Sequence, residues 1–202
     1  MKVAVALFLA VIVIIIGILL FGGDRDQRRM PEVTPTDSMK KGTLQISSPE
    51  FRNNEVIPAR YTCDGDDISP PLSIVGVPAK AKTLVLIVDD PDAPSGTFDH
   101  LVVFNIPAPD KSLESISPGA FGEKLPWGSL GDNGARYGRN SWGRLGYGGP
   151  CPPSGTHRYF FKIYALDGAL SLPVGVGKKE IERMMSGHIL EEASLVGLYK
   201  RS

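Results

Sequence analysis

The hydrophobic positions between residues 83 and 166 form three runs of strand length. They are Thr83–Asp89 (TLVLIVD), His100–Ile106 (HLVVFNI) and Arg158–Leu166 (RYFFKIYAL). Short apolar runs rich in β-branched and aromatic residues are typical of buried strands. The pattern therefore predicts three core strands, of which the first has the strongest signal.

Shorter apolar patterns predict weaker strands toward the two ends of the same region. The candidates are residues 43–47 (TLQIS), 55–61 (EVIPARY) and 194–199 (SLVGLY). Pro58 has no backbone N–H to donate, so the second candidate is expected only at the edge of a sheet.

One segment has helical periodicity, from Lys178 to about Glu192 (KKEIERMMSGHILEE). The apolar residues at 181, 184, 185 and 189 share one helical face, although Gly187 weakens the helix locally. Strands dominate and do not alternate with helices. The expected fold is therefore mainly β, an antiparallel, sandwich-like arrangement with a C-terminal helix and long irregular loops. The glycine-rich stretch 117–149 is the longest loop, and loops of that length are usually functional.

An unbroken apolar run, Val3–Phe21, precedes this region. As a helix it would be about 28 Å long, close to the thickness of the hydrocarbon core of a bilayer. No Ala-x-Ala-like cleavage site follows it. Residues 1–23 are therefore expected to form a single-pass transmembrane helix, with a cleaved signal peptide as the alternative. The flanking charges leave the orientation open, and we expect the domain outside the cytoplasm, or secreted if the signal is cleaved.

Residues 24–42 are polar, contain two prolines and lack apolar periodicity, which predicts a flexible linker. The folded domain is then expected at residues 43–202. The chain has 22 basic and 22 acidic residues and no basic block, so nucleic-acid binding has no electrostatic support.

Two proline-rich loops adjoin the core strands, and each contains a histidine. GGPCPPSGTHRYFF, residues 148–161, precedes and enters the last core strand, and DDPDAPSGTFDH, residues 89–100, connects the first two. Proline fixes φ and glycine permits unusual backbone angles, so such loops hold one shape and can approach a ligand closely. The pair of loops predicts a pocket at a sheet edge that contains His100 and His157.

The sequence contains two cysteines, Cys63 and Cys151. They would be ordinary buried thiols in a cytosolic protein, but they are a candidate disulfide in an exported one. Both flank loops expected to converge on the pocket, so we expect them within disulfide reach. Their spacing matches no metal-ligand pattern.

Five segments together resemble the phosphatidylethanolamine-binding protein family, in its bacterial and archaeal Raf-kinase-inhibitor-like branch. They occur in the right order and cover most of residues 43–201: YTCDGDDISPPL (61–72), VDDPDAP (88–94), HLVVFNIP (100–107), YGGPCPPSGTHRYFFKIYALD (147–167) and GHILEEASLVGLYKR (187–201).

The resemblance implies a β-sandwich-like fold with a small surface pocket for phosphate or a phosphoethanolamine-like head group. The implied ligand-binding residues are Asp90, Pro94, His100, Pro152, His157 and Tyr159. A further implied role is the regulation of a kinase or protease partner through the protein surface. Relatives commonly carry tryptophan or histidine beside the first histidine and tryptophan after SPPL. This chain has Phe98-Asp99 and Ser73-Ile74 there, which leaves the identity of the head group open.

The residue types fit an anion site independently of the family. Both histidines can donate from a ring nitrogen, and a bound anion would raise their pKa. Asp90 could accept a hydrogen bond from one ring and fix its tautomer, while Tyr159 offers a hydroxyl group.

The backbone around these side chains could add further donors. N–H groups at Gly148, Gly149 and Gly155 are candidates for an anion-binding nest. Asp92 and Asp99 are expected to stabilise their turn through nearby backbone N–H groups.

The favoured function is therefore a non-enzymatic binding protein without a cofactor. The alternative is a hydrolase-type enzyme, with Cys151 and His157 as nucleophile and base, or with Asp90, His100 and His157 as a metal site. The thiol version requires a reduced Cys151, which a bond to Cys63 would exclude.

Overall fold

The computed structural model describes residues 44–109, 112–122 and 134–201, which fall within one unit, Met39–Ser202. The predicted transmembrane helix (1–23) and linker (24–42) lie outside these residues. Within the described part of the chain, no helix is long and apolar enough to cross a bilayer.

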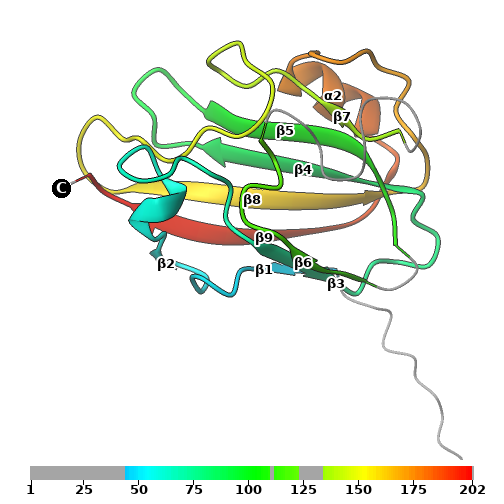
Figure 1. The fold of residues 1–202 in the computed structure, drawn as a ribbon. Helices are drawn as coiled ribbons and strands as arrows, with labels where there is room; N and C mark the ends of the chain where they lie inside the picture. The colour runs from blue at the N-terminus through cyan, green and yellow to red at the C-terminus, as the bar shows by residue number, and fades with distance from the viewer. Residues whose placement is uncertain (1–43, 110–111, 123–133, 202) are drawn as a thin grey trace, which may run out of the picture. The chain divides into compact units, whose positions relative to one another are not determined.

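A six-stranded sheet contains the three predicted core strands side by side at its centre (Figure 1). Neighbouring strands are antiparallel, except that β2 runs parallel to β9. The strand order is β2 (Glu55–Val56), β9 (Ile189–Tyr199), β8 (His157–Leu166), β4 (Thr83–Asp90), β5 (Phe98–Pro107) and β7 (Arg136–Tyr137).

A smaller antiparallel sheet covers one face of the large sheet. It contains β1 (Gln45–Ser47), β3 (Leu72–Val75) and β6 (Ser112–Ile116), with β3 in the middle. Ile46 and Ile74 from this sheet belong to the same buried cluster as Leu86 and Val103 from the large one. The mainly β, sandwich-like prediction is confirmed for the described residues.

The helix α2 (Lys178–Met185) lies over the other face of the large sheet (Figure 1). Its Ile181 and Met185 are buried with Val85 and Ile87 of β4. The central strand is therefore covered on both sides, which explains why all eight of its residues are buried. A continuous apolar run, rather than an alternating one, is the pattern that such a strand requires.

The C-terminal helix is shorter than predicted. It ends at Met185, and Ile189, which was assigned to its apolar face, begins strand β9. Gly187 has a φ of +84°, which glycine tolerates and other residues rarely adopt. The periodicity is misleading here because β9 pairs with β8 along nearly its whole length, and these ladder hydrogen bonds outweigh helical continuation.

The weaker strand predictions were partly right. The strand expected at 55–61 is limited to Glu55–Val56, and residues 59–61 form a short 3₁₀ helix after Pro58. Strands β3 and β6 were not predicted. The loop expected at 117–149 contains the two-residue strand β7, although residues 123–133 lie outside the described part.

A disulfide joins Cys63 to Cys151, as predicted, with the two Cα atoms 5.4 Å apart. A hydrogen bond from the Cys63 N–H to the Pro150 carbonyl oxygen, 3.1 Å long, joins the same two loops. The loop that follows η1 (Ala59–Tyr61) is thus fixed to the loop that precedes β8.

Reduction of this disulfide should lower the free energy of unfolding by about 4 to 5 kcal/mol, because the bond closes a loop of 88 residues. Urea unfolding of the wild type with and without reductant measures the difference. A Cys63→Ser/Cys151→Ser double variant is the control. Its unfolding midpoint should equal that of the reduced wild type and should not change when reductant is added. Equal midpoints for the oxidised and reduced wild type would contradict the expectation.

Candidate functional site

A cavity of about 480 Å³ opens where β4 ends and β8 begins. We call it the two-histidine pocket, because His100 and His157 both line it. All the residues predicted to bind a ligand lie on its wall: Asp90, Pro94, His100, Pro152, His157 and Tyr159. The disulfide Cys63–Cys151 lines it as well, so the brace between the two loops is part of the wall.

Strand alternation places the pocket side chains of β4 and β8. Asp90 follows Leu86 and Val88 at intervals of two, so its side chain is on the same face of the sheet as these core residues. Tyr159 and His157 precede Phe161 of the same core at intervals of two. The ends of two neighbouring strands thereby deliver a carboxylate, an imidazole and a phenol to one face.

A β-bulge directs His100 to the same face. Val88 pairs with Leu101 and Asp89 pairs with Asp99, so His100 is the extra residue of β5. Leu101 packs in the core between the sheets, and the neighbouring His100 lines the pocket. Regular alternation would separate the two residues, whereas a bulge re-aims a side chain locally.

His157 is paired with Asp90 inside the protein. Its Nδ1 is 2.7 Å from Asp90 Oδ2, and both side chains are less than a tenth exposed. The other carboxylate oxygen, Oδ1, accepts the backbone N–H of Asp92 at 2.8 Å. Asp90 therefore both orients the imidazole and stabilises the turn after β4. With Nδ1 engaged, Nε2 is the ring nitrogen of His157 that remains for a ligand.

His100 is held by the backbone of the opposite loop. Its Nδ1 is 2.7 Å from the carbonyl oxygen of Gly148, and the Gly148 N–H donates to the His100 carbonyl at 3.1 Å. A carbonyl oxygen only accepts, so Nδ1 carries the proton. Burial lowers the pKa of His100, against the opposing effects of this hydrogen bond and of nearby Asp90 and Asp99. The ring is therefore neutral near pH 7, with Nε2 as an acceptor that becomes a donor on protonation.

Tyr159 lies between the two histidines. Its ring packs edge-on against His100 at 5.2 Å and is stacked with His157 at 6.5 Å between centroids. The hydroxyl group is buried and has no well-formed hydrogen bond among the described residues. Burial, followed by the charge of Asp90, raises the pKa of Tyr159, so the group stays a potential O–H donor.

The predicted glycine nest is largely unavailable. The N–H of Gly148 donates to His100, and that of Gly149 donates to Asp67 Oδ1 at 2.6 Å. A Cβ atom at Gly149 would approach this carboxylate to 2.7 Å and the backbone of Thr62 to 2.8 Å. These glycines are thus needed for close packing of the two loops, and their N–H groups are not free for an anion.

The roles predicted for Asp92 and Asp99 were wrong. Asp92 accepts two hydrogen bonds from the Arg158 guanidinium, at 2.7 and 2.9 Å, and one from its backbone N–H. These bonds lower the pKa of Asp92 to about 2. Asp99 pairs with Lys178 of α2 at 2.5 Å. Both carboxylates therefore connect distant segments, because side chains at the end of a strand face neighbouring elements as well as their own turn.

Several pocket residues were not predicted as site residues. Asp67, Phe98, Trp142 and Arg144 also line the cavity. Trp142 and Arg144 come from the long loop 117–149, so the length of that loop was the available signal. Nothing in the local sequence indicates that its tryptophan reaches His100, with ring centroids 5.1 Å apart.

The geometry of the two candidate catalytic sites does not support the alternative of a hydrolase-type enzyme. Cys151 is in the disulfide and has no thiol to ionise. Among the described residues, Asp90, His100 and His157 do not belong to any group of three or more ligands that could hold a metal ion.

The buried, neutral state of His100 should make the fold sensitive to mild acid. The pKa is below 6.5 in the folded protein and about 6.5 in the unfolded chain, so the unfolded chain binds more protons as the pH falls through this interval. Stability is therefore present above about pH 6.5 and decreases below it. Between pH 7.5 and pH 5.5, the thermal midpoint of the wild type should decrease more than that of His100→Asn. The asparagine keeps a donor toward Gly148 but does not titrate. Equal decreases would refute this role.

The domain matches known proteins in both sequence and structure. The phosphatidylethanolamine-binding protein family model matches residues 47–200. A UPF0098 protein of Methanothermobacter thermautotrophicus is 51% identical over 158 residues, which cover 78% of this chain and 99% of the relative. A UPF0098 protein of Pyrococcus horikoshii is 49% identical over 164 residues, covering 80% and 79% of the two chains.

Two crystal structures have the same fold. A putative phosphatidylethanolamine-binding protein homologue of Chlamydia trachomatis has a TM-score of 0.68 and 38% identity, covering 80% of this chain and 99% of its own. YbcL of E. coli, described as a new member of the mammalian family, has a TM-score of 0.67 and 31% identity, covering 79% and 99%. Because family model, sequence relatives and solved structures agree over the same domain, the chain belongs to the phosphatidylethanolamine-binding protein family.

Proposed function

We propose that the protein is a non-enzymatic binding protein whose two-histidine pocket takes a phosphate-type anion, either free or as a phospholipid head group. One observation carries the proposal. Two imidazoles, at the ends of different strands, each have Nδ1 fixed by a protein acceptor, and both line one cavity. This arrangement leaves the Nε2 atom of each ring as the nitrogen that can face a ligand.

The neighbouring groups are compatible with an anion. The Asp90 carboxylate is already engaged by His157 and by the Asp92 N–H, so its charge is partly compensated. The Tyr159 O–H is buried and has no well-formed hydrogen bond with the described residues, and a buried donor in that state costs free energy that a ligand acceptor could recover. The Tyr159 hydroxyl and a protonated His100 would supply two donors. Nε2 of His157 would supply a third only in the imidazolium form, because Nδ1 already carries the proton that faces Asp90.

Binding of an anion should be coupled to protonation of His100. Burial holds the pKa of this ring below 6.5, whereas an anion beside Nε2 would raise it. Between these two pKa values, binding takes up a proton, so affinity is high at low pH and decreases as the pH rises through the pKa of the complex. His100 would thus be neutral before the anion binds and would take up a proton when it binds.

A kinase or protease partner, implied by the family resemblance, stays a prediction and is not needed for this proposal. The same holds for the transmembrane helix predicted at residues 1–23. If such an anchor is present, it would keep the pocket close to lipid head groups, which is one reason to include them among the candidate ligands.

The first experiment measures binding of inorganic phosphate and of O-phosphoethanolamine to the full chain in detergent by calorimetry. His157→Asn should weaken both by about 1.5 to 3 kcal/mol, the range for hydrogen bonds to charged groups. The asparagine can still donate to Asp90, but it has no equivalent of Nε2. His188→Asn is the matched control, because His188 forms a similar pair with Asp167, at 2.8 Å, in an exposed position outside the pocket. Equal affinities in wild type and His157→Asn would remove the basis of the proposal.

The pH dependence is tested with sulfate, whose charge is constant across the neutral range. Wild-type affinity should decrease steadily from pH 6 to pH 8, and His100→Asn should bind more weakly with a flatter profile. If O-phosphoethanolamine binds more tightly than inorganic phosphate, a phospholipid head group is favoured over free phosphate as the ligand. A pH-independent affinity for sulfate in wild type would contradict the coupling to His100.

A further inference from the structure

We propose that Arg144, held against Trp142, is the cation that pairs with the bound anion, and that the apolar wall beside it contacts the organic part of the ligand when the ligand is a phosphate ester. This inference rests on the proposed function and extends it to a residue outside the predicted set. Arg144 and Trp142 both line the two-histidine pocket and come from the loop after β7.

The charges around the pocket indicate that such a cation is needed. The described residues that line it include two carboxylates, Asp67 and Asp90. Burial lowers the pKa of His100, which favours its neutral form near pH 7, and His157 is engaged with Asp90. Arg144 is the one lysine or arginine among these lining residues. An anion that entered without it would meet two negative groups and no permanent positive one.

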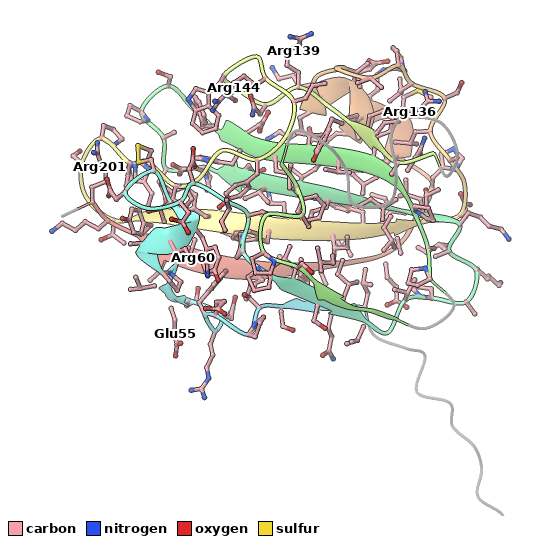
Figure 2. The ribbon with its side chains drawn as sticks, viewed as in Figure 1. Glu55, Arg60, Arg136, Arg139, Arg144 and Arg201 are labelled. Atoms are coloured by element: carbon pink, nitrogen blue, oxygen red, sulfur yellow. A yellow bond between two sulfur atoms is a disulfide. The ribbon has the colours of Figure 1, made fainter. Side chains whose placement is uncertain are left out.

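The guanidinium of Arg144 is also uncommitted. It lies over the Trp142 ring, 5.2 Å from the centroid, and makes no hydrogen bond or ion pair with another described side chain. Nearby arginines are already engaged. Arg158 is paired with Asp92, and Arg139, on the same loop (Figure 2), donates to the carbonyl oxygens of Gly143 and Gly175. Arg144 therefore retains the planar set of donors that matches a phosphate group.

The loop holds Arg144 in place through a buried asparagine. Asn140 Oδ1 accepts the backbone N–H groups of Trp142 and Arg144 at 3.1 and 3.0 Å, and its Nδ2 donates to the Gly146 carbonyl at 3.1 Å. Asn140 is only 4% exposed, so little water competes for its side-chain atoms. A loop fixed in this way reduces the ordering cost when a ligand binds.

Ring contacts position Trp142, which is 41% exposed. Its ring packs against Phe98 at 4.7 Å and against His100 at 5.1 Å between centroids. A Cβ atom at Gly148 would lie 2.4 Å from the indole, so glycine is required for this close approach. Trp142 thus acts as a positioning residue, because it connects the guanidinium to the ring of His100 across one aromatic contact.

The rest of the wall indicates what the anion is attached to. Apolar residues make up much of the lining, namely Ala93, Pro94, Phe98, Pro152 and Pro153. The volume of about 480 Å³ is in the range of pockets for small organic ligands. A phosphate ester would satisfy both parts, with its charged group between the histidines and Arg144 and its organic part along the prolines.

The experiment compares phenyl phosphate with inorganic phosphate, on the full chain, at low and at moderate salt. Arg144→Gln should bind both about tenfold more weakly than wild type and with a smaller salt dependence. Arg183→Gln is the control, because it removes the same charge from an exposed ion pair on α2, outside the pocket. Phenyl phosphate should bind wild type several-fold more tightly than inorganic phosphate.

The positioning role of Trp142 has its own readout. Trp142→Phe should keep most of the affinity and of the salt dependence, whereas Trp142→Ala should lose both, as Arg144→Gln does. Thermal unfolding of each variant shows whether the domain still folds.

The outcomes separate this inference from the proposed function. If wild type binds phosphate and Arg144→Gln binds it equally well at both salt concentrations, the role of Arg144 is refuted and the proposed function stands. Equal affinities for phenyl phosphate and inorganic phosphate refute the contact between the organic part and the apolar wall. If wild type binds neither probe at any pH, the proposed function itself fails.

Discussion

The pocket depends on the buried hydrogen bond between Asp90 and His157. It joins the last residue of β4 to the first residue of β8, at 2.7 Å, where the two strands are neighbours in the sheet. A carboxylate in this environment requires a partner, because a buried polar group left without one costs about 1 to 3 kcal/mol, and more when the group is charged. The same carboxylate fixes the ring of His157 and the turn at Asp92. The geometry of the pocket and the local fold therefore both depend on one side chain.

The neighbouring residue shows how one strand end serves two faces. Asp89 is directed to the opposite side from Asp90, where it binds Lys162 at 2.8 Å and Lys178 of α2 at 3.2 Å. Two consecutive carboxylates thus have different structural roles. One holds the helix against the sheet, and the other orients a pocket histidine. This division follows from the pleat, because adjacent side chains in a strand point to opposite faces.

The pocket wall is stiff by several independent means. The disulfide fixes Cys151 to Cys63, the Gly149 N–H binds Asp67, and Asn140 organises the loop that carries Trp142. Such a wall suits recognition of a small ligand by preformed groups, without a large closing motion. It also explains the abundance of proline and glycine in the two loops, since proline limits the backbone and glycine permits close approach.

The central strands, the two histidine loops and the family were evident from the chain because they depend on local signals. Continuous apolar runs such as Thr83–Asp89 indicate burial on both faces, and proline-glycine motifs specify rigid loops. The six pocket residues that the family resemblance implied all line one cavity. The spacing of the two cysteines, by contrast, gave a pairing only through the expectation that their loops converge.

Other features arose from contacts between segments far apart in the chain. The helix was predicted too long because the pairing of β9 with β8 is not encoded in the periodicity around Ile189. The bulge at His100, its neutral state, and the use of the Gly148 and Gly149 N–H groups all depend on how the strands and loops meet. Burial and hydrogen-bond partners are properties of the packed chain, so local sequence patterns name the residues of a pocket, while the fold sets their charge, their tautomer and their free atoms.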